Sequence, residues 1–200
     1  MIDALTPEEI ALLSLSDETI IKQSEEWCFD QTAYYKRMKS SSERWQRIIL
    51  THLHFEHVID QLLRDAIPFP DEIKLSRMSF QNRLDLARAL DLIPAQLTVV
   101  TRAISGLRNK LAHRLNFSVE DDRVRDLMGL LPKPLREAVE QEHQPGDGRD
   151  EELSRILVAT LATLESYRHR WKSERVIRTK RQLKVKEAVI NFKALAMTDD

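Results

Sequence analysis

The chain has few of the residues that characterise secreted, membrane-spanning or metal-stapled proteins. Its 200 residues include one cysteine, Cys28, with only 4 glycines and 7 prolines. A single cysteine cannot form an internal disulfide or a zinc knuckle. No apolar run approaches the ~18 residues of a membrane span, and residues 1–13 lack the basic start and apolar centre of a secretory signal. We therefore expect a cytoplasmic protein that does not associate with membranes.

Several common enzyme motifs are also missing. The sequence has no P-loop, no GxGxxG turn after a strand, no GxSxG elbow and no HExxH zinc motif. Lys and Arg total 31 against 32 Asp and Glu, a formal net charge of -1, so bulk charge gives no argument for nucleic-acid binding. We expect no cofactor, and charge has to be considered segment by segment.

The patterns that are present predict an all-α fold. Apolar residues recur at three-to-four spacing over long stretches, and clusters of β-branched residues are few. We expect an antiparallel helical bundle at residues 42–171, flanked by an acidic N-terminal helical segment, 1–41, and a basic C-terminal helical extension, 172–200. The expected helices cover 42–67, 79–94, 95–114, 118–131, 132–141 and 153–171, and an earlier helix begins at a capping box of Thr6 and Glu9.

Charge is concentrated at the two ends of the chain. Residues 1–30 hold eight acidic residues against one base, Lys22, while residues 168–186 hold nine bases against one acid, Glu174. The basic stretch suggests phosphate contacts, for which the candidate nucleic-acid-binding residues are Arg175, Arg178, Lys180 and Arg181. Two simpler interpretations remain open: the basic stretch pairs with the acidic N-terminal helix, or it forms a solvated face.

The segment RNKLAHRLNF, residues 108–117, carries the most specific chemistry. Arg108 can hold a phosphate or its pentacoordinate transition state with two donors, and His113 can take and give a proton near neutral pH. These are the two functions that metal-free RNA cleavage requires. Arg47 and His52 have the same spacing, but His52 lies on the apolar stripe of its helix, so we interpret it as a core residue.

Other candidate side chains lie on the helix at 42–67. Glu56 and Asp60 are four residues apart and are candidates for a helper carboxylate, although Asp60 has a simpler role as the partner of Arg64. His54 and His57 have a helical spacing that suits a metal, but no additional ligand is evident, so we expect no metal site.

The motif Arg108-Asn109-Lys110-Leu111-Ala112-His113 resembles the RN-x-x-AH form of the HEPN superfamily. A narrower resemblance, to the mannitol-operon repressor-like branch, spans SFQNRLDLARALDLI, the motif helix and FSVEDDRVRDLMGLL, roughly residues 79–131. The helix at 42–67 is similar to an earlier core helix of that family. The branch that carries Tyr two residues after the His is not matched, because this chain has Leu115.

The resemblance implies a HEPN-like antiparallel helical bundle that forms a homodimer, in which motif helices from two chains form a shared cleft. Active members cut RNA without metal and leave a 2',3'-cyclic phosphate, in stress response, toxin–antitoxin systems or phage defence. By the match, His113 would be the acid and base, Arg108 the phosphate clamp and Asn109 the orienting residue. Other members are regulators or protein-binding modules, and the alternative function is a non-enzymatic, mannitol-repressor-like regulator with an antitoxin or other protein partner.

Helix geometry adds an expectation that does not depend on the family. At 100° per residue, Arg108 and His113 differ by about 140° around a regular helix, so a helix end or a second chain is needed to bring them together. Gly106 predicts a close contact with a second chain, since glycine within a helix costs ~1 kcal/mol relative to alanine. The alternative is an ordinary helix end, with Arg108 salt-bridged and His113 at the negative end of the helix dipole.

Overall fold

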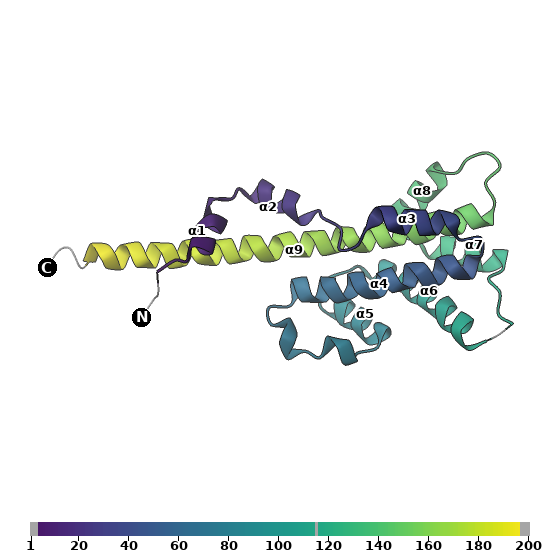
Figure 1. Ribbon diagram of the computed structural model, residues 1–200, viewed down its shortest axis with the longest axis horizontal. Coiled ribbons are helices and arrows are strands. Elements are labelled where there is room, and N and C mark those ends of the chain that lie inside the picture. Colours follow the sequence, from purple (N-terminus) through teal and green to yellow (C-terminus); the bar gives the residue numbers. More distant parts are fainter. Residues whose placement is uncertain (1–3, 115, 197–200) are drawn as a thin grey trace. The chain divides into compact units, whose positions relative to one another are not determined.

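The computed structural model describes residues 4–114 and 116–196, with side chains described as far as residue 192. Within these ranges the chain is all-helical and has no strand, as the sequence predicts (Figure 1). The helices are α1 (Pro7–Ser14), α2 (Asp17–Ser24), α3 (Gln31–Ser40), α4 (Arg44–Ala66), α5 (Phe80–Ala89), α6 (Ala95–His113), α7 (Asp121–Leu130), α8 (Lys133–Gln141) and α9 (Arg149–Ala196), with short 3-10 helices at Pro70–Glu72 and Leu75–Arg77. No described helix is both long and apolar enough to cross a bilayer.

The described helices belong to two compact units. Unit 1 consists of residues 4–26 and 169–196, which include α1, α2 and the C-terminal part of α9. Unit 2 consists of residues 27–114 and 116–168, with α3 to α8 and the N-terminal part of α9. The three segments expected from the sequence are therefore grouped into two units, with α3 in the larger one.

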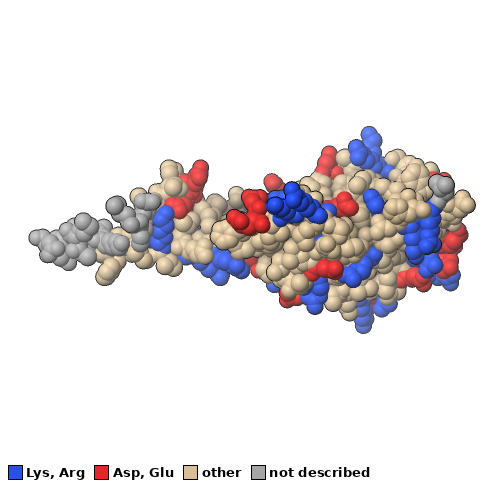
Figure 2. Space-filling model, turned by 90° about the horizontal axis from the view of Figure 1, so that it is seen from below, with Lys and Arg blue, Asp and Glu red and all other residues tan. Residues whose placement is uncertain are grey.

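The core of unit 2 is built from the apolar stripes of α4, α6 and α9. The predicted stripe residues that are buried are Ile48, Phe55, Ile59 and Leu62 of α4, Leu97, Val100, Ile104 and Leu107 of α6, and Leu153, Ile156, Leu157, Leu161 and Leu164 of α9. His52 is buried among them, as expected. Trp45 was also expected on the buried stripe, but it is 46% exposed because it lies in the first turn of α4, at the edge of the bundle. The surface of unit 2 mixes acidic and basic side chains (Figure 2).

Helix α5 is shorter than the sequence predicts. It begins near Ser79, as expected, and the structure shows Ser79 as its N-cap, but it ends at Ala89 rather than near Pro94. Asp91 has φ 56°, a left-handed conformation that stops the helix. The turn allows Leu92 and Ile93 to enter the core, where they are 3% and 0% exposed.

The start of α7 also differs from the prediction. Ser118 was expected to cap this helix, but α7 begins at Asp121 after Glu120, without a side-chain cap. The Ser118 hydroxyl instead donates a hydrogen bond to the carboxylate of Glu120. Asp121 and Asp122 in the first turn are favourable at the positive end of the helix dipole, which partly replaces the missing cap.

Unit 1 is held together by ion pairs between its acidic helices and α9. The predicted capping box of Thr6 and Glu9 is present at the start of α1. The Lys180 ammonium donates to the carbonyl oxygen of Leu15 at 2.5 Å and to Asp17 Oδ1 at 2.7 Å. Lys186 binds both carboxylate oxygens of Glu9 at 3.0 Å. Of the alternatives left open by the sequence, pairing between the acidic and basic segments therefore occurs for these lysines.

Candidate functional site

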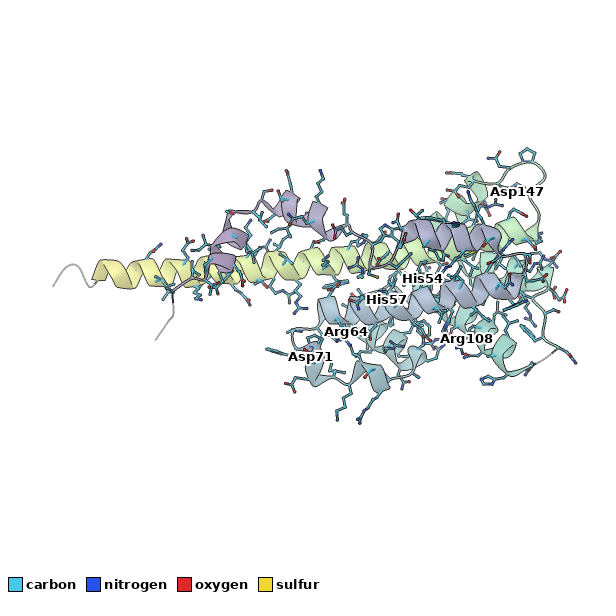
Figure 3. The ribbon with its side chains drawn as sticks, in the orientation of Figure 1. His54, His57, Arg64, Asp71, Arg108 and Asp147 are labelled. Atoms are coloured by element: carbon cyan, nitrogen blue, oxygen red, sulfur yellow. The ribbon has the colours of Figure 1, made fainter. Side chains whose placement is uncertain are left out.

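The motif residues lie in the last two turns of α6, which ends at His113. Arg108 is half-buried, while Asn109 and His113 are exposed. Arg108 Nη1 donates a hydrogen bond to Asn109 Oδ1 over 3.3 Å, which links the two adjacent side chains (Figure 3 labels Arg108). The end of α6 therefore presents a guanidinium, an amide and an imidazole close to one another in sequence and at the surface.

Arg108 has no carboxylate partner among the described residues. Most of the other arginines of unit 2 do form ion pairs with Asp or Glu: Arg44, Arg64, Arg83, Arg88, Arg102, Arg123, Arg149, Arg155 and Arg168. The ordinary-helix-end interpretation required a salt-bridged Arg108, and the described part of the chain supplies no such bridge. A guanidinium in this state can still offer paired donors to a phosphate.

His113 is compatible with both interpretations drawn from the sequence. An exposed imidazole can exchange protons with a substrate, and a cation at the C-terminal end of a helix is also favourable. Because α6 is continuous through both positions, Arg108 and His113 keep their separation of about 140°. A single chain therefore does not direct both side chains to one side of the helix. Leu115, where the sequence departs from one branch of the family, lies outside the described residues.

A buried polar cluster lies beneath the motif helix. His52 Nε2 of α4 is 3.0 Å from Ser105 Oγ of α6, and Gln81 Nε2 of α5 donates to the same hydroxyl oxygen over 3.0 Å. His52 and Ser105 are each 2% exposed, and the His52 ring packs edge-on against Phe80 with centroids 4.7 Å apart. Sequence analysis placed His52 in the core but missed Ser105 and Gln81, because nothing in their spacing identifies a hydrogen bond between helices.

The surroundings of His52 favour one neutral tautomer. Its Nδ1 atom lies 3.5 Å from Glu56 Oε1 and has no hydrogen-bond partner among the described residues. A proton on Nδ1 would face the carboxylate favourably, so Ser105 donates to the bare Nε2. Burial lowers the pKa of His52; Glu56 opposes this effect, and the cations Arg108 and Arg83 add to it. The ring therefore lies within electrostatic reach of the motif arginine.

The two candidate helper carboxylates are already engaged by other residues. Asp60 accepts from Arg64 at 2.8 Å and from Arg83 at 3.4 Å, which matches its simpler interpretation as the partner of Arg64. Glu56 lies beside His52. The structure does not join either carboxylate directly to Arg108 by a hydrogen bond or an ion pair in the described residues.

The histidines of α4 have structural contacts. His54 packs against the rings of Phe29 and Tyr34, with centroids 4.4 and 4.8 Å away. His57 Nε2 lies 2.9 Å from the carbonyl oxygen of Cys28 (Figure 3). Within the described ranges, no group of three or more His, Cys, Asp or Glu side chains is arranged to hold a metal ion.

A hollow of about 620 Å³ lies beside the end of α6. Its apolar lining comes from Trp45, Leu111 and Phe117, and its carboxylates are Glu43, Glu120, Asp121, Asp122 and Asp150. Arg44 binds Asp150 at 2.6 Å and Asp121 at 2.7 Å within it. The excess of carboxylates repels a phosphate backbone.

No contact within the described chain explains why residue 106 is a glycine. A methyl group at this position would meet no atom within 4 Å, apart from the neighbouring turns of its own helix. A hollow of about 310 Å³ lies beside it, lined also by Ala103, Lys110 and Leu127. The open space suits a second chain, and the contact expected at Gly106 remains a prediction.

The four candidate nucleic-acid-binding residues of α9 do not share one environment. Lys180 has a side chain that is 8% exposed and is bound by Asp17, so little of it can reach a phosphate. Arg175, Arg178 and Arg181 are exposed. Of the four candidates, these three arginines are therefore the ones that a phosphate could reach.

Comparison of the chain with protein families, with curated proteins and with solved structures found no match. The resemblance to the HEPN superfamily therefore depends on the motif and its helical context.

Proposed function

We propose that this chain is a homodimeric, metal-independent endoribonuclease of the HEPN kind, with Arg108, Asn109 and His113 in its active site. The observation that carries the proposal is the state of Arg108, whose guanidinium has no carboxylate partner in the described part of the chain. The hydrogen bond to Asn109 leaves the other guanidinium donors available for phosphate oxygens. An exposed histidine lies five residues further along the same helix.

In the proposed reaction, His113 accepts the proton of a ribose 2'-hydroxyl, and the 2'-oxygen attacks the adjacent phosphorus. The bond from phosphorus to the 5'-oxygen breaks, and that oxygen takes the proton from the same His113, which returns to its neutral form. The products are a 2',3'-cyclic phosphate and a 5'-hydroxyl. Arg108 stabilises the extra negative charge on the pentacoordinate phosphorus, and Asn109 holds the guanidinium in place.

The proposal requires a second copy, because one helix directs Arg108 and His113 to different sides. An apolar strip on α4 supports such a pairing: Trp45 is 46% and Leu53 is 55% exposed, with Ile49 half-buried between them at four-residue spacing. Trp45 lines the same hollow as Leu111 of α6, so the strip begins beside the motif helix. Burial of this strip between two copies would contribute about 25 cal/mol per Å² of apolar surface.

A second candidate is a regulator that binds a protein partner. Two adjoining hollows, of about 470 and 310 Å³, follow α6 and α7, and Ala103 and Leu130 line both. Val99 in the first hollow is 50% exposed. A mostly apolar groove of this kind suits a helix from another protein, which is the expected site if the motif has no catalytic activity.

The test is cleavage of a mixed-sequence RNA pool in excess EDTA by wild type, Arg108→Ala and His113→Ala. Arg102→Ala is the matched control, because Arg102 is an exposed arginine of the same helix that pairs with Asp85. We expect cleavage by wild type and the control, with cyclic-phosphate ends, and at least a ~100-fold loss in the two motif variants. Circular dichroism would establish that all four proteins are folded.

Two outcomes would count against the ribonuclease. If concentrated, dimeric wild type leaves the RNA intact, the protein-binding candidate is favoured. If Arg102→Ala and Arg108→Ala lose activity equally, the loss reflects the helix rather than the motif.

A further inference from the structure

One face of α9 in unit 1 is both basic and apolar. At 100° per residue, several side chains of unit 1 lie within about 40° of the direction opposite the buried Leu183. Among them are Arg178, Arg181, Val185 and Phe192, which we name the outer face of α9. Val185 is 65% and Phe192 is 73% exposed, and the two arginines are exposed without an ion pair among the described residues.

The order of side chains along this face limits what can cover it. Its N-terminal half is basic, and its C-terminal half is apolar. A parallel pair of identical faces would place arginines against arginines, and an antiparallel pair would bury Arg178 and Arg181 against Val185 and Phe192 without a counter-charge. Glu174 also lies on this side of the helix, but Arg170 binds it at 2.9 Å. The face therefore suits a surface with both carboxylates and apolar groups.

Helix α2 of the same unit has such a surface. Its buried residues, Ile20 and Ser24, define the inner side. The outer face of α2 consists of the exposed residues Glu18, Ile21, Lys22 and Glu25. Glu18 and Glu25 form no ion pair with a described residue, and Ile21 is 45% exposed. Lys22 is the single cation of this face, so the face remains acidic.

We infer that the outer face of α2 in one copy of the chain binds the outer face of α9 in a second copy. In this contact Glu18 and Glu25 pair with Arg178 and Arg181, while Ile21 packs on the apolar half. The same chemistry already operates within the chain, where acidic residues of α1 and α2 bind lysines of α9. Complementary charge provides the orientation, and the apolar groups provide buried surface.

The contact joins two different faces and does not close on two copies. Lys180 and Lys186 bind α2 and α1 on the side of α9 that bears Leu183, so the outer face of α9 lies on the opposite side of the helix. An interface between unlike faces leaves one of each unoccupied at the two ends of an assembly. The chain therefore associates head to tail, and the assembly grows with concentration. This contact is independent of the proposed active site in unit 2.

The test exchanges the charges of the two faces. The first variant is Arg178→Glu with Arg181→Glu, and the second is Glu18→Lys with Glu25→Lys. We expect wild type to form larger species with rising concentration in sedimentation velocity at about 0.05 M salt, and to lose them near 0.5 M. Each variant alone should associate at least ~10-fold more weakly, and an equimolar mixture of the two should recover wild-type association.

The control is Lys39→Glu with Arg125→Glu, which makes the same charge change as the first variant at exposed positions of unit 2. It should associate like wild type. The inference is overturned if wild type and the first variant have the same size distribution at low salt. It is also overturned if both variants are folded and dissociated but their mixture does not reassociate, because the two faces then do not recognise each other.

Discussion

His52 Nε2 of α4 lies 3.0 Å from the hydroxyl oxygen of Ser105 in α6, and this hydroxyl also accepts from Gln81 of α5. One buried oxygen therefore joins three helices beneath the candidate site. Ser105→Ala should lower the free energy of unfolding by about 1–3 kcal/mol, because it leaves a buried ring nitrogen and an amide without a partner. Urea unfolding would measure the change. Ser118→Ala, at an exposed position, should have little effect.

The stability of unit 2 should fall as the pH is lowered below neutrality. Burial lowers the pKa of His52 in the folded protein, so between the unfolded value of ~6.5 and the folded value only the unfolded chain takes up the proton. The contribution of His52 to the free energy of unfolding should be constant above about pH 7.5 and decrease from there towards pH 5. His54, whose pKa burial also lowers, contributes with the same sign.

The variant His52→Gln separates this effect from other titrations. The free energy of unfolding, measured with urea at pH 7.5 and at pH 5.5, should differ less between the two pH values in this variant than in wild type. If the free energy of unfolding changes between the two pH values as much as in wild type, His52 is not the source of the pH dependence.

Arg168 balances the charge of a buried carboxylate. Arg168 Nε donates to Glu165 Oε2 at 2.5 Å, and Glu165 is completely buried. Glu165 also accepts from the backbone N–H of Cys28 at 2.6 Å. Arg168→Met should destabilise the protein by about 3–5 kcal/mol, because it leaves a buried charge without its cation. The double variant with Glu165→Gln should recover part of that loss in thermal unfolding, and a loss that is simply additive would contradict the explanation.

Lys180 should control the attachment of the acidic helices to α9. The variant Lys180→Met keeps the length of the side chain but loses the bonds to Asp17 and to the carbonyl oxygen of Leu15. Limited proteolysis should then cut within residues 4–26 faster than in wild type. Lys184→Met, at an exposed position of the same helix, is the matched control and should be cut at the wild-type rate.

Mixing two inactive variants tests whether the proposed ribonuclease site is shared between chains. If Arg108 comes from one subunit and His113 from the other, a heterodimer of Arg108→Ala and His113→Ala keeps one intact site. Random exchange makes about half of the dimers heterodimers, so about a quarter of the wild-type activity should return. If the mixture stays inactive after subunit exchange, each site takes both residues from one chain.

The parts of the fold that depend on local patterns could be predicted from the sequence. The capping box at Thr6, the helix start near Ser79 and the apolar stripe through Phe55 depend on residues a few positions apart. The end of α5 could not be predicted in this way, since Asp91 adopts its left-handed turn so that Leu92 and Ile93 reach the core. Tertiary burial outweighed the local helical pattern there.

For the candidate site, the sequence likewise indicated the candidate residues and their spacing but not their contacts in space. The motif identified Arg108, Asn109 and His113, and the helix period correctly indicated that one regular helix separates the first from the last. The state of Arg108 depends on which carboxylates reach it in space, and the contact between His52 and Ser105 joins residues 53 positions apart. Local spacing contains no information about either.

The guanidinium of Arg44 has a consequence for how sequences of this kind can diverge. It donates to Asp121 at the start of α7, to Asp150 at the start of α9 and to the carbonyl oxygen of Val119, so one side chain fastens the first turns of three helices. A neutral residue in place of Arg44 would leave two carboxylates facing each other across the gap. In diverged sequences, Arg44, Asp121 and Asp150 should therefore be exchanged together rather than singly, and such covariation would mark chains that close this end of the bundle in the same way.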